Sequence, residues 1–245
     1  MKLFTFAARA VVVSVVTIST ADAGKISGSV TYKGKPRPPK SILMSADAVC
    51  AALHPTQAKD EKMIVGKGEG DIHPLANVFV YVKSGLKKQD HPVPDKPVVI
   101  DQKGCTYVPH VLGARVGQEI QFKNSDKTMH NVHSLSKKTS TQFNRGMPAG
   151  SPNAKYKLTK PEVMAKIKCD AHTWMTCYVG ALEHPFFAVT GKDGKFSIDS
   201  LDDGEYEIEA WHEMEKKGLP RQVAKVTVTG GAATHDFEFV RIKKK

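Results

Sequence analysis

Short runs of alternating apolar and polar residues, separated by turn residues, constrain this chain more than any other feature. Three such runs are Ile26–Tyr32, Glu119–Lys123 and Val163–Cys169, and Ala76–Val82 is typical of a buried strand. Alternation places every second side chain on one face, so we expect strands with one face on a core. Asp193-Gly194 has the composition of a hairpin turn. Many short strands with such turns favour an all-β fold built of sandwiches.

Few segments fall outside this pattern. One short helix is expected at Ala46–Leu53. Residues 84–96 are polar with two prolines and are expected to form a linker or a long surface loop. Residues 146–161 are expected to form a second long loop, in which Tyr156 and Leu158 belong to a short strand.

The first 23 residues have the pattern of a secretory signal peptide. Lys2 supplies the positive start, a short apolar run follows, and Ala21-Asp22-Ala23 fits a small-residue cleavage site. A membrane anchor is the alternative, but the uninterrupted apolar run is about half of the ~20 residues that a span requires. We therefore expect a secreted protein, periplasmic or extracellular, that begins at Gly24 and has no transmembrane anchor after cleavage.

The chain is basic, with 36 Lys and Arg against 25 Asp and Glu, a net charge of +11 that falls to +10 when Lys2, Arg9 and Asp22 leave with the signal. This balance favours acidic partners. Nucleic acid is the usual alternative, but the signal peptide and the scattered lysines argue against it. The composition leaves the oligomeric state open.

The residues that carry chemistry lie in two pieces, Asn124–Ser134 and Lys168–Gly180. In the second piece Cys169, His172 and Met175 are spaced C-x2-H-x2-M. The strand pattern points Cys169 into the core, and the short loop after it can turn the three side chains toward one point. Thiolate, imidazole and thioether are donors suited to copper, and His130 from the first piece would complete a plane of two histidines and one cysteine with a weak axial Met.

Other chemistries fit these residues less well. Zinc would require a second C-x2-C or H-x3-H element. A binuclear copper centre would require two cysteines in one loop, and Cys177 lies beyond Met175. A nucleophilic Cys–His pair would need an orienting third group, and none is apparent. We therefore expect a protein that is not an enzyme.

Residues 97–183 resemble the cupredoxins, and the C-x2-H-x2-M loop is most similar to that of the amicyanin type. His130-Asn131-Val132 is similar to the segment that carries the first ligand histidine in plastocyanin-like proteins. The resemblance implies a Greek-key β-sandwich with one mononuclear type 1 copper. His130, Cys169 and His172 would be the equatorial ligands and Met175 the axial one. The spacing of about 38 residues between His130 and Cys169 departs from the family, so the resemblance does not fix the strands between them.

A second resemblance covers residues 24–96 and 184–245. The segments Ile26–Pro36, Ala76–Val82 and Phe186–Glu213 are similar to carboxypeptidase regulatory-like, transthyretin-like domains. This implies a second β-sandwich in which the cupredoxin domain is inserted or on which it packs. Chains of this layout are often labelled methylamine-utilisation or plastocyanin-like proteins, although nothing in the sequence points to methylamine metabolism.

Four cysteines follow the signal peptide, and an oxidising compartment permits disulfides. Because Cys169 is needed as a metal thiolate and Cys177 flanks the same loop, Cys50–Cys105 is the favoured pair. Cys177 is then expected to be a buried free thiol that acts as a small apolar residue.

Several residues near the expected ligands are candidates for supporting the metal site. The Asn131 amide either ties the two ligand loops together or is an ordinary turn residue. Trp174 either packs simply or shields the copper and leaves the His172 edge as the route for electrons. His133 is expected on the surface, and His110 and His212 in structural or interdomain contacts.

The favoured function is one-electron transfer with an acidic redox protein. The expected steering lysines near the ligand strands are Lys123, Lys127, Lys137, Lys138, Lys166 and Lys168. One alternative is a copper-binding or copper-delivery protein that uses Met129, Met147 and Met164 as further donors. The other is a structural or adhesive sandwich with a vestigial metal site.

Overall fold

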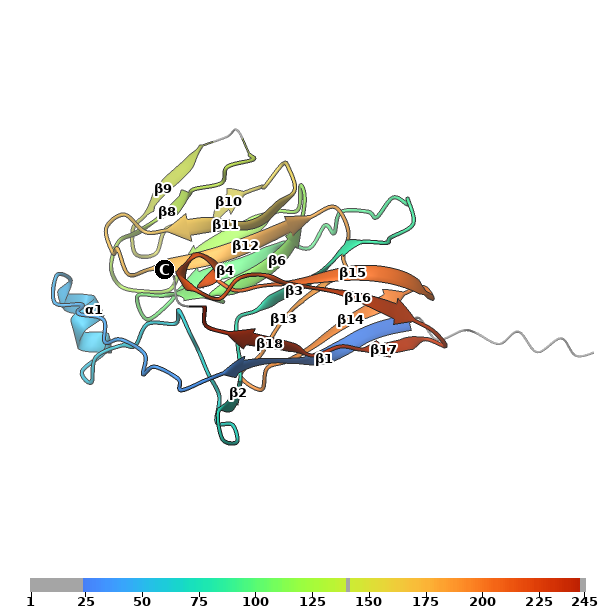
Figure 1. The fold of residues 1–245 in the computed structure, drawn as a ribbon. Helices are drawn as coiled ribbons and strands as arrows, with labels where there is room; N and C mark the ends of the chain where they lie inside the picture. The colour runs from blue at the N-terminus through green and yellow to red at the C-terminus, as the bar shows by residue number, and fades with distance from the viewer. Residues whose placement is uncertain (1–23, 140–141, 243–245) are drawn as a thin grey trace, which may run out of the picture.

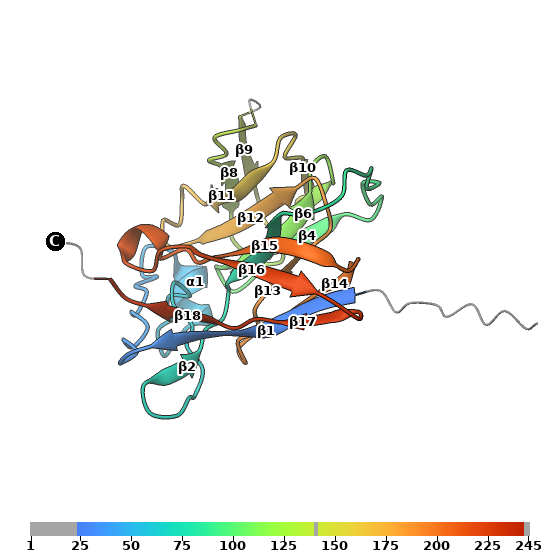
Figure 2. The same ribbon diagram turned by 45° about the vertical axis from the view of Figure 1, so that its right-hand side comes forward.

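The computed structural model describes residues 24–139 and 142–242, so the expected signal peptide lies outside the described residues. The fold is all-β, with a single short α-helix, α1 (Ala48–Leu53), within the described residues. The strands form four sheets, and Figures 1 and 2 show them stacked in layers. The described residues contain no helix that is long and apolar enough to cross a membrane.

Two of the sheets form the sandwich that carries the site residues. The first sheet has the order β10-β7-β4-β5, and the second has the order β6-β12-β11-β8-β9. The strands are β4 (Val98–Gln102), β5 (Tyr107–Val108), β6 (Val111–Arg115), β7 (Ile120–Asn124), β8 (His130–Ser134), β9 (Phe143–Met147), β10 (Ala154–Tyr156), β11 (Glu162–Lys168) and β12 (Thr176–Leu182). Their inward side chains, among them Phe122 and Ile167, form one hydrophobic core.

The other two sheets form a second sandwich from strands that precede and follow this stretch. One sheet is built around β1, which pairs with β14, β17, β18 and β2, and the other has the order β13-β3-β15-β16. The strands are β1 (Gly24–Lys33), β2 (Ile72–Pro74), β3 (Phe79–Ser84), β13 (Phe187–Val189), β14 (Lys195–Leu201), β15 (Gly204–Trp211), β16 (Gln222–Val228), β17 (Ala232–Thr234) and β18 (Phe237–Val240). Ile26, Val80 and Phe196 belong to their own separate core.

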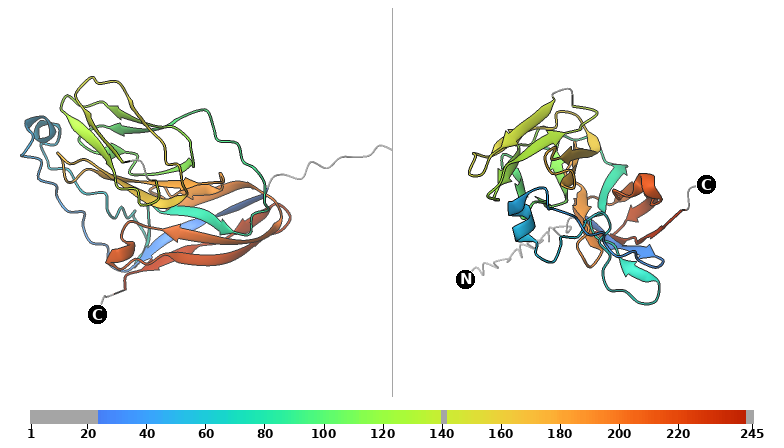
Figure 3. Two further views of the ribbon diagram at one scale, coloured as in Figure 1. Left: turned by 90° about the horizontal axis from the view of Figure 1, so that it is seen from above. Right: turned by 90° about the vertical axis from the view of Figure 1, so that its left-hand side faces the viewer.

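The two sandwiches pack face to face. A third apolar cluster, including Phe79, Met164 and Trp211, lies between the sheet of β12 and the sheet of β15. In the view from above, both sandwiches extend in the same direction, and the long connection after β1 runs to α1 beside the first sandwich (Figure 3, left). The second sandwich therefore covers the part of the outer face of β11 and β12 that carries Met164 and Leu182.

This packing explains where the alternation in Val163–Cys169 breaks. Ala165 and Ile167 point into the first core as expected, but Met164, expected to face water, is also buried. Its φ of 76° marks a register irregularity between Glu162 and Ala165. A bulge of this kind re-aims a side chain, and here Val163, expected in the core, packs together with Met164 in the contact between the sandwiches.

The remaining local expectations hold in part. The helix expected at Ala46–Leu53 forms at Ala48–Leu53, capped by the Asp47 side chain. The segment 84–96 is largely irregular after β3, as expected. The loop expected at 146–161 begins only after β9, which ends at Met147, and the short strand expected within it forms as β10 (Ala154–Tyr156) and does not include Leu158.

Candidate metal centre

Three of the four expected ligands come together at one end of the first sandwich. His130 opens β8, whereas Cys169 and His172 lie in the loop that joins β11 to β12. Because β8 and β11 are paired neighbours, with His133 opposite Lys168, the two pieces of chain are side by side. The ring nitrogens of the two histidines and the Cys169 sulfur all lie within 4.8 Å of one another, and all three residues are buried.

The contacts inside this group define which atoms face one another. The Nδ1 atoms of His130 and His172 are 2.9 Å apart, and the Cys169 Sγ is 3.7 Å from the His172 Nδ1. The two backbone amides of Asn131 and His172 donate to the Cys169 Sγ at 3.5 and 3.3 Å. The Cys169 Sγ also lies 3.3 Å from the Asn131 side-chain oxygen, so both ligand segments fix its position.

The loop that carries the ligands is closed by its own backbone. The Cys169 amide donates to the Met175 carbonyl at 3.1 Å, and the Met175 amide donates to the His172 carbonyl at 2.8 Å. Met175 is buried in the same core cluster as Cys169. It therefore starts from the same loop as two of the donors and stays the expected axial ligand.

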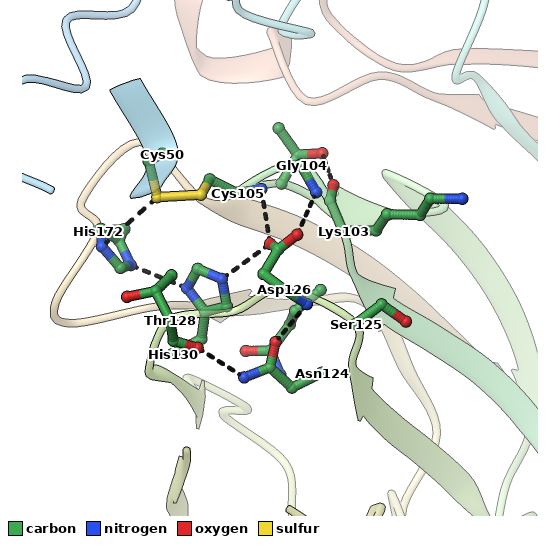
Figure 4. A network of polar contacts seen from close by, with 12 residues as sticks. Cys50, Lys103, Gly104, Cys105, Asn124, Ser125, Asp126, Thr128, His130 and His172 are labelled. Atoms are coloured by element: carbon green, nitrogen blue, oxygen red, sulfur yellow. Dashed lines mark hydrogen bonds and ion pairs between the residues drawn. A yellow bond between two sulfur atoms is a disulfide. The ribbon is translucent and has the colours of Figure 1, made fainter. Parts of the chain in front are cut away.

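An aspartate holds the outer nitrogen of His130. The Nε2 atom of His130 is 2.9 Å from the Asp126 carboxylate, which accepts amide hydrogens from Gly104 at 2.7 Å and Cys105 at 2.8 Å (Figure 4). Burial is the largest influence on His130 and lowers its pKa, although Asp126 acts in the opposite direction. His130 is therefore held as a neutral ring in a fixed orientation.

A second aspartate holds His172, and it arrives from the second sandwich. The His172 Nε2 is 3.2 Å from the Asp47 carboxylate, and only 4% of His172 is exposed. The pKa of Asp47 is lowered to about 2, chiefly because the Cys50 amide donates to it. The expectation that the His172 edge would be the open route for electrons is therefore wrong, because the segment before β2 covers it.

The donor set fits a soft cation. A neutral imidazole carries one N–H, and an ionised carboxylate can only accept. With the N–H of each ring on the Nε2 that faces its aspartate, both Nδ1 atoms present lone pairs to each other across 2.9 Å. These two lone pairs, together with a sulfur that accepts hydrogen bonds from two amides, form a site that a bound cation would stabilise. A set of two imidazole nitrogens and one thiolate sulfur suits copper.

The cysteines are arranged as expected. Cys50 and Cys105 form a disulfide, which confirms the favoured pair, and Cys169 and Cys177 are free and buried. Burial raises the pKa of Cys177, as expected for a thiol that serves as core. The disulfide joins α1 to the turn between β4 and β5, beside His172 (Figure 4).

Asn131 ties the two ligand segments together, which confirms that interpretation over an ordinary turn residue. Its side-chain oxygen accepts the Asp170 amide at 2.6 Å, and its side-chain nitrogen donates to the Asp170 carboxylate at 3.0 Å. His133, expected on the surface, is only partly exposed, with Nδ1 3.0 Å from the same carboxylate. Trp174 donates to the Cys105 carbonyl, and its ring lies 5.0 Å from that of His172.

The sequence reasoning missed the three aspartates. Asp126 and Asp170 adjoin the ligand segments, so a search for acids next to candidate ligands would have found them. Asp47 has no local signal, because 125 residues separate it from His172.

The methionines named for copper delivery are differently placed. The Met147 sulfur accepts a hydrogen bond from Gln102, and Met164 lies between the sandwiches. Met129 is 56% exposed beside His130. Of the six lysines expected to steer a partner, Lys123 and Lys168 instead pair with Asp101 and Asp170.

His110 joins the two sandwiches, as expected for an interdomain contact. Its Nε2 lies 2.7 Å from the Glu213 carboxylate, and both side chains are almost fully buried. Burial acts to lower the pKa of His110, but the hydrogen bond and charge of Glu213, with Glu61, outweigh it and raise the pKa. His212 is buried beside this pair, and burial lowers its pKa to about 4.

Comparisons with known proteins give partial likenesses. No family model and no curated protein matches the chain. Among solved structures, a copper-containing nitrite reductase from Thermus scotoductus SA-01 is similar at 19% identity and a TM-score of 0.34, over 41% of this chain and 26% of that one. This chain thus spans about a quarter of that enzyme's length.

Two smaller proteins are similar over most of their own length. A purple cupredoxin from Nitrosopumilus maritimus matches at 20% identity and a TM-score of 0.30, over 34% of this chain and 98% of that one. A reduced amicyanin variant matches at 21% identity and a TM-score of 0.32, over 36% and 85%. These TM-scores are low, and the donor atoms of the candidate site are therefore the basis for assigning a function.

Proposed function

We propose that the protein is a type 1 copper protein that transfers single electrons outside the cytoplasm, and that it is not an enzyme. One observation carries this proposal: a ring nitrogen from each of two histidines and one cysteine sulfur lie within 4.8 Å of one another, and all three residues are buried. His130, Cys169 and His172 would hold the ion in a plane, with Met175 as the weak axial donor. Copper bound there would supply the Cu(I)/Cu(II) couple.

The residues of the chain have three tasks in this function. Asp126 and Asp47 orient the two rings, the amides of Asn131 and His172 fix the position of the Cys169 sulfur, and the buried surroundings exclude water. Hydrogen bonds of this kind hold a ligand set in place whether or not the ion changes charge. A fixed ligand set suits electron transfer better than delivery, in which the ion has to leave.

The visible spectrum of the copper-loaded protein tests the proposal. The oxidised protein is expected to be blue or green through thiolate-to-Cu(II) charge transfer, and Cys169→Ala should abolish the band. Cys177→Ala is the matched control, because it removes the other buried free thiol and should keep the band. A colourless parent protein after stoichiometric copper loading, or full colour in Cys169→Ala, would contradict the proposal.

A further inference from the structure

We propose that Asp47, which reaches the site from the second sandwich, is a positioning residue that orients His172 and closes the outer edge of that ring. This inference rests on the proposed function and deepens it. The cap segment, residues 36–60, leaves the second sandwich after β1 and carries α1 to the end of the first sandwich (Figures 1 and 3). A part of the chain outside the ligand-bearing sandwich therefore completes the surroundings of the ligand.

The two carboxylate oxygens of Asp47 have separate tasks. Oδ1 accepts the Cys50 amide at 3.0 Å and so caps α1. Oδ2 accepts the Thr128 hydroxyl at 2.7 Å and lies 3.2 Å from the His172 Nε2. Because Thr128 precedes His130 by two residues, Asp47 contacts both ligand-bearing segments.

The disulfide and the turn of Gly104 and Cys105 connect the segments that hold the two aspartates. The disulfide anchors Cys50, and with it α1, to Cys105, whose amide donates to Asp126. Asp126 in turn faces His130, so the turn of Gly104 and Cys105 is connected to both imidazoles (Figure 4). The two rings are therefore oriented from outside by one aspartate each, and the disulfide ties together the segments that hold the two aspartates.

A carboxylate on the outer nitrogen makes an imidazole a stronger donor. A stronger and more negative donor set favours Cu(II) over Cu(I), so Asp47 is expected to lower the reduction potential. Its position also covers the ring edge, so a redox partner has to approach the site by a surface other than the His172 edge.

Two substitutions separate the parts of this role. Asp47→Ser keeps a good N-cap for α1, so the helix should persist, but its hydroxyl is too short and neutral to replace the carboxylate. Asp47→Asn keeps the length and, with its one oxygen, the cap, but it places an amide NH2 where the second carboxylate oxygen faces His172. The first readout is the tautomer of His172 in the apo protein, from long-range 1H–15N spectra. The second is the reduction potential of the copper-loaded protein.

In the parent protein His172 is expected to carry its proton on Nε2 alone. Asp47→Asn should move the proton of His172 toward Nδ1, because its amide nitrogen donates to Nε2 while its oxygen caps α1, and the potential should rise. Asp47→Ser should give a mixture of tautomers and a similar or larger rise. Loss of an outer partner typically changes metal affinity by about 10-fold or more, and a tenfold change in the Cu(II)-to-Cu(I) affinity ratio corresponds to about 59 mV.

Asp71→Asn is the control, because it removes the same charge from an exposed residue of the connection between β1 and β2. It should change neither readout. A parental tautomer and potential in Asp47→Ser, or an equal shift in Asp71→Asn, would overturn the role of Asp47. A parent protein without a charge-transfer band would instead overturn the copper function, while the apo tautomer would still report on Asp47.

Discussion

Around the candidate metal centre, single side chains decide which atom of each donor faces inward. His130 and His172 turn their Nε2 atoms to aspartates, which leaves their Nδ1 atoms facing each other and the Nδ1 of His172 beside the Cys169 sulfur. The sulfur is in turn fixed by backbone amides on both sides. Met175 differs, because its place in the set comes from the loop and its burial, so it should tune the site more than it holds it.

The difference between equatorial and axial donors is measurable. Met175→Leu should keep the charge-transfer band, because Cys169 and both histidines remain, and should raise the reduction potential, because loss of a donor disfavours Cu(II) more than Cu(I). His130→Ala removes an equatorial donor and should weaken copper binding by more than the about 10- to 100-fold that loss of an outer partner costs. Metal analysis after identical dialysis checks both variants. Equal copper loss from the two would favour a copper-delivery protein.

At the scale of the elements, burial decides how far the sequence could predict the structure. Ile120 and Phe122 alternate with polar neighbours because only one face of β7 meets a core, so that strand could be predicted. The prediction for Met164 was wrong because the other face of β11 meets the second sandwich, which no local pattern reveals. The three donors of the candidate site could be named from spacing and residue type.

Asp47 could not be found in the same way. The residue has the local signature of a helix cap and nothing else, and its contact with His172 depends on the path of the cap segment. The Cys50–Cys105 pair was predicted by elimination, yet its position beside the site was not. Contacts that form only when the two sandwiches pack together produce no periodic pattern in the sequence.

The disulfide should matter for stability because it anchors α1, the one α-helix of the described residues, to the turn between β4 and β5. It closes a loop with a sequence separation of 55 residues, for which the chain-entropy relation gives about 4 kcal/mol. The double variant Cys50→Ser/Cys105→Ser should lose close to this amount, measured by urea unfolding of the apo protein. A control with Cys177→Ser, which breaks no disulfide, separates the cross-link from the simple loss of a buried sulfur. A double variant as stable as the parent would show that α1 is held by its other contacts.

Over the whole molecule, the packing of the two sandwiches brings buried charge into an otherwise apolar contact. The cluster of Phe79, Met164 and Trp211 supplies the apolar part. The pair of His110 and Glu213 supplies the charged part, with Glu61 nearby and His212 buried beside it. This pair joins the first sandwich to the segment after β15. The protonation of His110 should therefore influence the free energy of unfolding.

The sign of this pH dependence follows from the direction of each shift. The pKa of His110 is raised, so its contribution is fully present below the unfolded value of about 6.5 and is lost as pH rises through the folded pKa. The pKa of Glu213 is lowered by His110 against the opposing effect of burial, so its contribution fades only as pH falls. His212, with a pKa lowered to about 4, likewise loses stability only on the acid side. Because the effect of His212 already begins below about pH 6.5, the difference between a His110 variant and the parent at the same pH is what isolates His110.

His110→Gln should lower the free energy of unfolding by about 2 kcal/mol at pH 6, the scale of a hydrogen bond to a charged group. The loss should shrink toward pH 9, because the parent histidine gives up its charge over that range while glutamine never has one. Urea unfolding of the apo protein at both pH values measures the difference. In a Glu213→Gln background the same substitution should cost little at either pH, since its charged partner is gone. A loss of equal size at both pH values would mean that His110 contributes by packing and not by its charge.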